Sequence, residues 1–153
     1  MPHQISQISV RPATSDDVPR LCALLALLFT QEADFQPNSE KQSRALRLIM
    51  DQPEFGQIFC AINGESLIGM VSLLFTPGIT SAGPAAWLED LIVDPEWRGR
   101  GIGSLLLRES IRHAESVGCT RITLLTDAIN LSAIRFYERA GFLCTRSIPW
   151  RRR

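Results

Sequence analysis

A glycine- and arginine-rich run, RGRGIG at residues 98–103, is the feature that most constrains this chain. It follows an apolar run at residues 87–93 and precedes apolar residues at helical spacing, so it predicts a strand-to-helix turn. Glycines let the backbone approach a ligand closely, and the first N–H groups of a helix have no partner inside it. The helix dipole adds about half a positive charge there, and Arg98 and Arg100 add whole charges. The turn therefore predicts an anion site, suited to a phosphate.

The length and charge of the chain limit the classes of protein it can belong to. With 153 residues we expect a single domain over residues 1–153. Its 16 basic and 16 acidic residues cancel, which argues against a global attraction to nucleic acid or to an anionic membrane. The four cysteines form no Cys-x-x-Cys pair and have no neighbouring histidine, so we expect no metal site. The apolar run at residues 21–29 is too short to span a membrane and follows two aspartates, so a cytoplasmic location is expected.

The remaining patterns predict helices that alternate with strands. We expect a strand over 5–10, a helix over 17–33, a helix from Ser39 to before Pro53, strands over 57–62, 66–75 and 87–93, a helix from Ile102 to Gly118, a strand over 121–125, a helix over 132–140 and a last strand over 142–150. Asn63-Gly64 is typical of a tight hairpin turn, and Ser39 and Gln42 have the spacing of a capping box. Residues 77–84 are expected to form a mobile surface loop. This order, β-α-α-β-β-β-α-β-α-β, predicts an α/β fold with a mixed sheet.

A glycine-rich strand-to-helix turn also occurs in dinucleotide-binding folds and in P-loop enzymes. This chain has no Gly-Lys-Ser/Thr, so the lysine and the hydroxyl that P-loop hydrolysis requires are missing. A dinucleotide turn normally follows the first strand of its domain, whereas this turn follows the predicted hairpin. An RNA-binding interpretation lacks interleaved aromatic residues and a basic surface. A turn with only a structural role is the remaining alternative.

Two segments resemble motifs of the GNAT superfamily of acetyl-CoA-dependent N-acetyltransferases. Residues 88–103, LEDLIVDPEWRGRGIG, are similar to the family's central strand and its Arg/Gln-x-x-Gly-x-Gly/Ala loop, with Arg98, Gly101 and Gly103 at the motif positions. Residues 130–142, NLSAIRFYERAGF, are similar to its late Asn…Ala…Phe-Tyr…Gly-Phe segment. The resemblance implies the GNAT-like acyl-CoA N-acyltransferase fold, and the first third of the chain agrees with it by element order alone.

The resemblance implies acetyl-CoA as the cosubstrate. Its pyrophosphate would lie on the backbone amides of the loop, formed by Arg98, Gly99, Arg100, Gly101, Ile102, Gly103 and Ser104. Its pantetheine arm would pair with the exposed backbone of Leu91, Ile92 and Val93, where the family's central strands part, and a backbone N–H there can stabilise an oxyanion. Asn130 resembles the asparagine that hydrogen-bonds this arm; it also suits a helix N-cap, and the two roles are compatible.

Two side chains are candidates for proton transfer. Tyr137, the only tyrosine, occupies the position of the family's general acid, where its hydroxyl would hydrogen-bond the leaving sulfur; packing in the core is its alternative role. Glu89 lies on the predicted central strand, where a buried carboxylate with a raised pKa could accept the proton of the ammonium, directly or through water. Positioning the substrate and a structural role are equally open for Glu89. Strand alternation places Asp90 on the opposite face unless a bulge intervenes.

These features predict direct transfer of acetyl to a primary amine of a small molecule or a peptide, in a ternary complex. A non-catalytic acyl-CoA-binding or regulatory module with the same fold is the alternative, which the presence of Tyr137 disfavours. No nucleic-acid or membrane partner is expected. Since family members often pair through their C-terminal strands, a homodimer through the apolar residues 148–150 is a further expectation.

The acceptor amine stays open at this point. The resemblance places acceptor recognition in residues 28–52, in the loop at 77–84 and in the C-terminal strand. The first of these segments holds charges of both signs, from Glu32, Asp34, Glu40, Asp51, Arg44 and Arg47. The Leu-Glu-Asp sequence of the central strand is also reminiscent of aminosugar-phosphate acetyltransferases.

Overall fold

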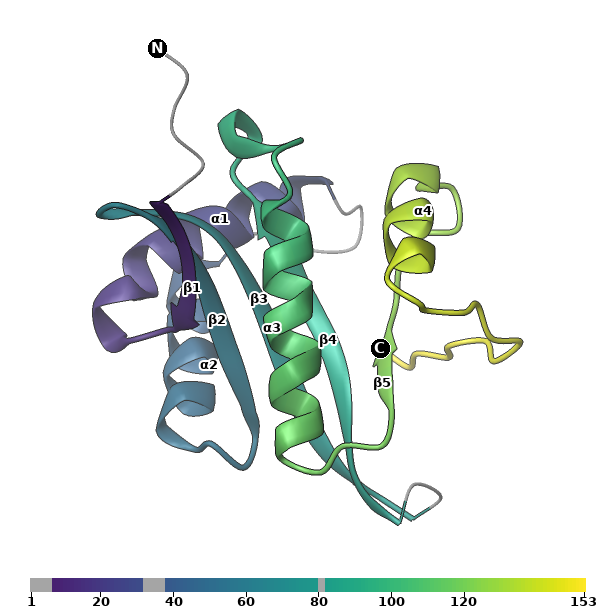
Figure 1. The fold of residues 1–153 in the computed structure, drawn as a ribbon. Coiled ribbons are helices and arrows are strands. Elements are labelled where there is room, and N and C mark those ends of the chain that lie inside the picture. The colour runs from purple at the N-terminus through teal and green to yellow at the C-terminus, as the bar shows by residue number, and fades with distance from the viewer. Residues whose placement is uncertain (1–6, 32–37, 80–81) are drawn as a thin grey trace.

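The structure is a computed structural model that describes residues 7–31, 38–79 and 82–153. Its elements, coloured along the chain in Figure 1, are β1 (Ile8–Pro12), α1 (Val18–Gln31), α2 (Ser39–Asp51), β2 (Gly56–Asn63), β3 (Ser66–Gly78), β4 (Gly83–Val93), α3 (Ile102–Ser116), β5 (Ile122–Leu124) and α4 (Leu131–Arg139). Short 3₁₀ turns precede α1 and α3, at Ser15–Asp17 and Pro95–Trp97. The order confirms the predicted mixed α/β fold. None of the helices in these ranges is long and apolar enough to cross a membrane.

The five strands form one sheet in chain order, β1-β2-β3-β4-β5. Neighbouring strands are antiparallel except β4 and β5, which are parallel and are connected through α3. The hairpin of β2 and β3 turns where Asn63 pairs with Ser66, and Gly64 there has φ +60°, which confirms the predicted turn. A parallel pair needs a crossover connection, so α3 is brought against one face of the sheet.

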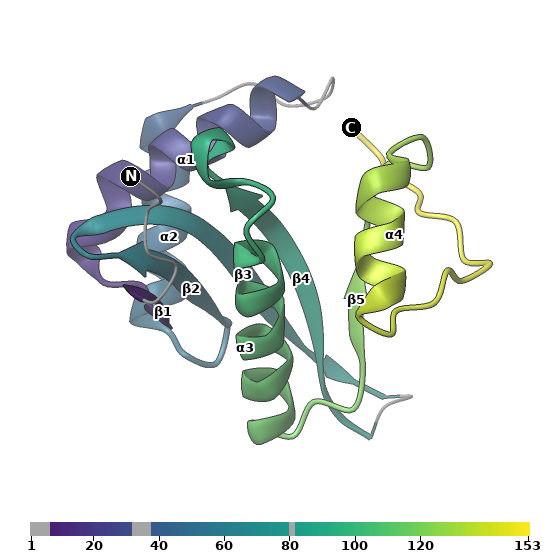
Figure 2. The same ribbon diagram turned by 45° about the horizontal axis from the view of Figure 1, so that its top comes forward.

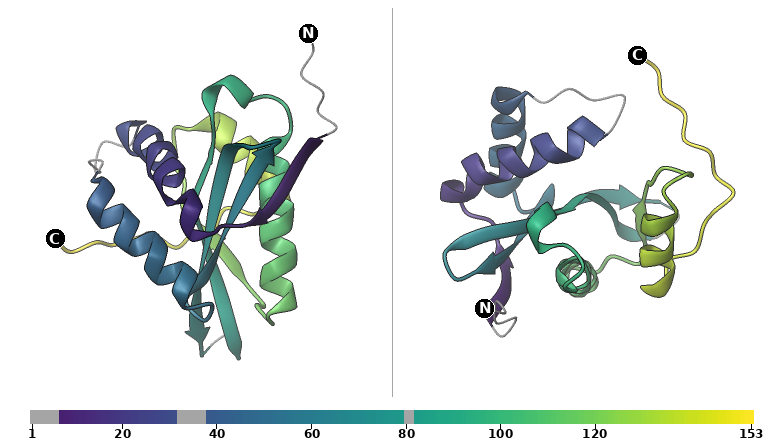
Figure 3. Two further views of the ribbon diagram at one scale, coloured as in Figure 1. Left: turned by 90° about the vertical axis from the view of Figure 1, so that its left-hand side faces the viewer. Right: turned by 90° about the horizontal axis from the view of Figure 1, so that it is seen from above.

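Helices cover both faces of the sheet, as the view from above in Figure 3 shows, and α4 lies beyond the β5 edge. The apolar side of α1 and α2 packs with residues such as Met70 in one core cluster. The buried side of α3 packs on the other face with Val71 and Leu73. Neighbouring residues of β3 thus enter opposite clusters, as strand alternation requires. Burial on both faces explains the near-continuous apolar runs of the central strands.

One residue of β4 departs from strand geometry. Asp90 has φ +53°, in the left-handed region that residues with a side chain seldom adopt. The pairing with β3 shifts at the same place, because Ser72 lies opposite Glu89 whereas Met70 lies opposite Ile92. Two residues of β4 therefore face a single residue of β3, which is a β-bulge. The bulge overrides the simple alternation that would place Asp90 and Glu89 on opposite faces.

Two local sequence predictions need correction. The loop at 77–84 is shorter than expected, because β3 and β4 stay paired as far as Gly78 and Gly83. Helix α2 is capped by Asn38, whose side-chain oxygen accepts from the backbone N–H of Lys41 at 3.1 Å, so Ser39 is the first helical residue and not the cap.

The strand predicted at 142–150 is absent, since residues 142–153 contain no helix or strand. The strand β5 is only three residues long and gives such a segment few backbone groups to pair with. Ile148 and Trp150 are 74% and 94% exposed. The homodimer expected through this end of the chain stays a prediction.

Candidate active site

The turn between β4 and α3 has the backbone that its sequence predicts. Gly99 and Gly101 have φ +75° and +79°, and an added Cβ at either position would meet nothing within 4 Å. Glycine is thus required here for its left-handed conformation rather than for space. Helix α3 begins directly after Gly101, whose carbonyl accepts from the N–H of Leu105 at 3.1 Å. The N–H groups of residues 102–104 have no acceptor inside the helix, and this is the geometry of an anion site.

The three residues that follow Gly101 contribute differently to this helix end. The side chain of Ile102 is buried in the core, so only its backbone can contact a ligand. An added Cβ at Gly103 would lie 3.5 Å from the ring of Phe136, which is ordinary van der Waals contact, so α4 packs close to this point. Ser104 is exposed and lines the groove described below.

The two arginines of the loop are engaged with the protein itself. Arg98 donates through Nε to the carbonyl of Val93 at 3.1 Å. The guanidinium of Arg100 lies 4.7 Å from the centroid of the Trp97 ring, and its Nη2 donates to the carbonyl of Glu96 at 3.3 Å. Their charges remain beside the turn, but in this structure both side chains brace the loop against β4 and the 3₁₀ turn.

A second brace connects the loop to α1. Asp94 caps the 3₁₀ turn by accepting from the N–H of Glu96 at 3.0 Å, and its other oxygen accepts from Arg20 Nη2 at 2.6 Å. Arg20, on α1, also donates through Nε to the carbonyl of Leu67 at 3.0 Å. The hydrogen bond from Glu96, and then the contact with Arg20, hold the pKa of Asp94 below its usual range. The sequence pattern alone did not single out Arg20.

Strand β4 loses its second neighbour where the cosubstrate is expected. Within the described residues β5 pairs with β4 only as far as Leu88, so the backbone at 91–93 has no strand partner on the β5 side. Figure 2 shows β4 continuing past the end of β5. The side chains of Leu91 and Val93 pack under α3, and Ile92 is buried on the other face. These three residues can therefore offer a ligand only their backbone, which fits the predicted pairing with an extended arm.

The bulge brings Glu89, Asp90 and Ser72 together. Ser72 Oγ lies 3.1 Å from the carbonyl oxygen of Glu89 and 3.1 Å from Oδ2 of Asp90. A hydroxyl has one proton and donates to one of these oxygens at a time. Burial raises the pKa of Asp90 above its usual range. When Asp90 is protonated it can donate to Ser72, which then donates to the carbonyl of Glu89, and the bulge is closed by two hydrogen bonds.

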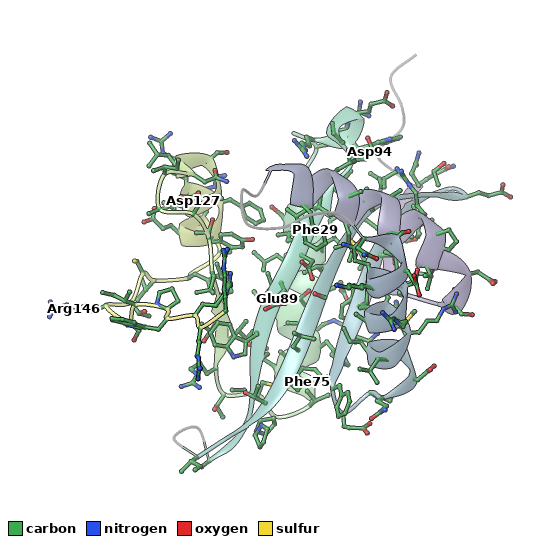
Figure 4. The ribbon with its side chains drawn as sticks, turned by 180° about the vertical axis from the view of Figure 1, so that it is seen from behind. Phe29, Phe75, Glu89, Asp94, Asp127 and Arg146 are labelled. Carbon is green, nitrogen blue, oxygen red and sulfur yellow. The ribbon has the colours of Figure 1, made fainter. Side chains whose placement is uncertain are left out.

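Glu89 differs from the sequence prediction in its surroundings. Its side chain is exposed rather than buried, and it lies near the middle of the sheet face opposite α3 (Figure 4). Strand alternation places Glu89 outward here, whereas the adjacent left-handed residue turns the Asp90 carboxyl toward Ser72. The raised pKa belongs to the neighbouring Asp90. The role of Glu89 as a base stays a prediction.

Tyr137 lies on α4 between two other rings. Its ring centroid is 5.1 Å from that of Phe136 and 5.9 Å from that of Phe142, both edge to face. Burial raises its pKa, so the phenol keeps its proton at neutral pH. Among the described residues no group hydrogen-bonds its hydroxyl, which leaves that proton for a ligand. Asn130 caps α4 by accepting from the N–H of Ala133 at 3.1 Å, which confirms the N-cap role.

A groove of about 420 Å³ runs between α3 and α4 and starts at the loop. It is lined by Gly101, Ser104, Leu105, Leu107, Arg108, Ile111, Phe136, Arg139 and Ala140. The sequence prediction had not included Arg108, Arg139 or the Ser72–Asp90 pair. A signal existed for Ser72, because it is a polar residue inside an otherwise apolar strand, but contacts between distant elements leave no pattern in a single sequence.

The comparisons agree with this geometry. The family model of the acetyltransferase (GNAT) family matches residues 21–142. The chain is 28% identical to an uncharacterised N-acetyltransferase of Methanocaldococcus jannaschii over 90% of this chain and 62% of that protein, so it spans less than two thirds of that relative. It is 31% identical to the aminoalkylphosphonate N-acetyltransferase of Salmonella typhimurium, with 87% and 83% covered.

A solved structure shows the same fold. The crystal structure of a transcriptional regulator from Bacillus halodurans is 32% identical, has a TM-score of 0.82 and is matched over 95% of this chain and 99% of that one. The family model covers well over half of the chain, and the relatives named N-acetyltransferase match most of its length. The chain belongs to the GNAT acetyltransferase family.

Proposed function

We propose that this protein transfers the acetyl group of acetyl-CoA to a primary amine. The observation that carries the proposal is the coincidence of two features at the end of β4. Within the described ranges the strand has no second partner after Leu88, and the turn that follows presents N–H groups of a helix end that have no acceptor inside the helix. An extended acyl arm and a diphosphate need these two features side by side.

The residues that would hold acetyl-CoA fit its chemistry. The backbone N–H groups at 99–104 would bind the diphosphate, since the glycines leave the helix end open. The backbone at 91–93 would pair with the amides of the pantetheine arm. The side-chain oxygen of Asn130 already accepts from the backbone N–H of Ala133, and its NH₂ group would donate to the pantetheine arm. The acyl donor supplies an activated thioester carbonyl at the end of that arm.

The acetyl transfer would require three contributions from the residues of this protein. The acceptor ammonium must lose a proton, which Glu89 would accept directly or through a water. The amine nitrogen then bonds to the thioester carbon, and the negative charge that develops on the carbonyl oxygen would be stabilised by a backbone N–H of β4 past the bulge. When the C–S bond breaks, the thiolate would take the proton of the Tyr137 hydroxyl, which has no other hydrogen-bond partner among the described residues. The nitrogen still carries one proton more than an amide, and it would return that proton to the Tyr137 phenolate, directly or through water. The products are then a neutral amide and coenzyme A, and Glu89 passes its proton to solvent.

The acceptor would approach from the face of the sheet opposite α3, where Glu89 is exposed. A carboxylate there attracts a cationic ammonium group. Two of the acidic residues considered from the sequence, Glu32 and Asp34, lie outside the described residues. The Salmonella relative is named for an aminoalkylphosphonate, and a Trypanosoma brucei relative that is 33% identical over 56% of this chain is named for glucosamine 6-phosphate. We therefore place small primary amines that also carry a phosphoryl group first among the candidates.

The proposal is tested by an amine panel with acetyl-CoA, read by release of free thiol. The panel contains an aminoalkylphosphonate, an aminosugar phosphate, a polyamine and a peptide with a free N-terminus. We expect thiol release above the slow background hydrolysis with at least one small amine. Calorimetry with coenzyme A is the companion measurement, and absence of binding contradicts the proposal whatever the panel shows.

A regulatory acyl-CoA-binding module is the second candidate. The Bacillus halodurans protein with 32% identity is named as a transcriptional regulator, which favours keeping this candidate. Such a module would bind coenzyme A and release no thiol with any amine. The Tyr137 hydroxyl, which has no hydrogen-bond partner in the part of the chain that the structure describes, favours the enzyme, because a module that only binds has no use for a proton donor at the sulfur. The cytoplasmic location and the homodimer stay predictions.

A further inference from the structure

Ser72 places a buried hydroxyl beside the bulge of β4. It is 3% exposed and lies in β3 between Val71 and Leu73, whose side chains pack under α3. Strand alternation therefore turns the Ser72 side chain toward the opposite face of the sheet, where Glu89 is exposed. A buried hydroxyl costs stability unless it is hydrogen-bonded, and the two oxygen contacts of this one both lie in the bulge.

The contact with the Glu89 carbonyl fixes the orientation of the peptide between Glu89 and Asp90. This peptide is trans, so its carbonyl and its N–H point in opposite directions. With the carbonyl 3.1 Å from Ser72 Oγ, the N–H of Asp90 points away from Ser72. The Glu89 side chain departs from one end of this peptide and the backbone at 91–93 follows from the other. A rotation of the peptide would therefore redirect both.

Asp90 completes the arrangement from the far end of the same peptide. Its φ of +53° is unfavourable for a residue with a side chain, so the surrounding contacts must hold it there. Its Oδ2 lies 3.1 Å from Ser72 Oγ, and burial raises its pKa, which favours the protonated form. Asp90 then donates to Ser72, and Ser72 donates to the Glu89 carbonyl. The two hydrogen bonds form one chain that spans the peptide.

We propose that Ser72 and Asp90 are positioning residues for acetyl transfer, which hold the peptide of the bulge so that the Glu89 carboxylate faces the acceptor and the backbone at 91–93 faces the acyl donor. The inference rests on the proposed function, and it adds two residues that act through the backbone. The glycine loop at 99–104 that would bind the diphosphate is not part of this hydrogen-bond chain. The effect of the pair should therefore lie in kcat and not in the affinity for coenzyme A.

The test compares Asp90→Gly with Asp90→Asn. Glycine and asparagine both tolerate the left-handed backbone, but only asparagine keeps a side-chain N–H that can donate to Ser72 Oγ. With the most active amine of the panel, we expect kcat to fall at least about tenfold in Asp90→Gly and to stay within about twofold of the wild type in Asp90→Asn. Ser72→Ala should lose as much as Asp90→Gly. Calorimetry should give an unchanged Kd for coenzyme A in all three variants.

The double variant with Ser72→Ala and Asp90→Gly tests whether the two side chains act as one unit. If they form a single hydrogen-bond chain, the double variant should have the kcat of the weaker single variant. A loss equal to the product of the two single losses would show that the side chains act independently, and it would reject the proposed pair.

Ser110→Ala is the matched control for the loss of a buried hydroxyl. Ser110 is 0% exposed, and its Oγ donates to the carbonyl of Leu106 at 2.9 Å within α3. This variant should lose stability much as Ser72→Ala does and keep the kcat of the wild type. Melting curves give the folded fraction of every variant at the assay temperature. Equal kcat values in Ser72→Ala and Ser110→Ala would show that Ser72 has only a structural role.

The outcomes separate this inference from the proposed function. If the wild type transfers acetyl and Asp90→Gly keeps its kcat, or if Asp90→Asn loses as much as Asp90→Gly, the positioning role is wrong while the proposed function stands. If the wild type releases no thiol with any amine, the proposed function fails and the positioning role fails with it. A raised Kd for coenzyme A with an unchanged kcat would assign the pair to cosubstrate binding and would also reject the positioning role.

Discussion

Strand β4 has two halves that are both rich in apolar residues but differ in their strand pairing. Up to Leu88 the strand pairs with β3 on one edge and with β5 on the other. Past the left-handed Asp90, β3 is its only strand partner among the described residues. The first half pairs on both edges, and the second half is the one that we propose pairs with the cosubstrate. The bulge at Asp90 lies between the two halves.

Shortening a buried side chain in the half of β4 that pairs on both edges should have the largest effect on the free energy of unfolding. Leu88 is 3% exposed and packs under α3, so Leu88→Ala should lower the free energy of unfolding by about 3 kcal/mol, because it leaves a cavity in the core. Leu91→Ala, in the half-buried part past the bulge, should cost only about 1 kcal/mol. Denaturant unfolding measures both. Equal losses would contradict the contrast between the two halves.

The chemistry of the open half is tested at the residue assigned to protonate the leaving thiolate. Tyr137→Phe keeps the ring between Phe136 and Phe142 and removes only the hydroxyl. We expect kcat to fall about 100-fold, with the Kd for coenzyme A unchanged. Steady-state kinetics and calorimetry measure the two quantities. A kcat within about threefold of the wild type would show that the thiolate leaves without this proton.

The loop after the open half offers a matched pair of glycines. Gly101→Ala places a side chain at φ +79° and should lower stability by about 1 kcal/mol and weaken coenzyme A binding. Gly103→Ala adds a Cβ that meets the Phe136 ring at 3.5 Å, ordinary contact in a helix, and should be nearly neutral for both. Thermal melts and calorimetry distinguish them. Two equally tolerated alanines would mean that the left-handed turn is not needed.

The smallest expected effect concerns the pH dependence of the bulge. Burial raises the pKa of Asp90, so the folded state binds the proton more tightly than the unfolded chain does. Its ionised form therefore costs stability above the folded pKa, and this cost disappears as the pH falls below the unfolded value.

Asp90→Asn removes that titration, and asparagine also tolerates the left-handed conformation. The variant should be more stable than the wild type at pH 7, and the difference should shrink toward pH 4, which denaturant unfolding at the two pH values measures. Asp90→Ala is the control, because it loses both the hydrogen bond to Ser72 and the tolerance of φ +53°. A stability difference between Asn and wild type that does not change with pH would contradict a raised pKa.

Local signals made most of the fold predictable. The Asn63-Gly64 turn and the cap at Asn130 fix their own backbone, so these predictions are confirmed without tertiary information. The strand at 142–150 was wrong because pairing depends on a partner, and β5 ends after three residues. Propensity can favour a strand but cannot supply its neighbour.

The parts of the candidate site that are formed by backbone groups could be predicted from the sequence. The glycine turn and the open edge of β4 follow from positions in one motif. Glu89 is exposed where the sequence predicted a buried carboxylate, and the half-buried Asp90 is turned toward Ser72, because a bulge that a single sequence cannot locate interrupts the alternation. The Arg20 brace joins two elements that lie far apart in the chain, and Arg108 and Arg139 reach one groove from two different helices. No spacing rule connects these residues.

The contacts of Arg20 connect helix α1 to the turn before the glycine loop. One guanidinium holds a carbonyl of the sheet and the carboxylate that caps the turn before the glycine loop, and it does so from the helix that borders the opposite face. A movement of helix α1 along the sheet would therefore strain the turn that leads into α3. The contact couples the side of the molecule where the acyl donor would bind to the side where the acceptor would bind, so a change on one side is felt on the other.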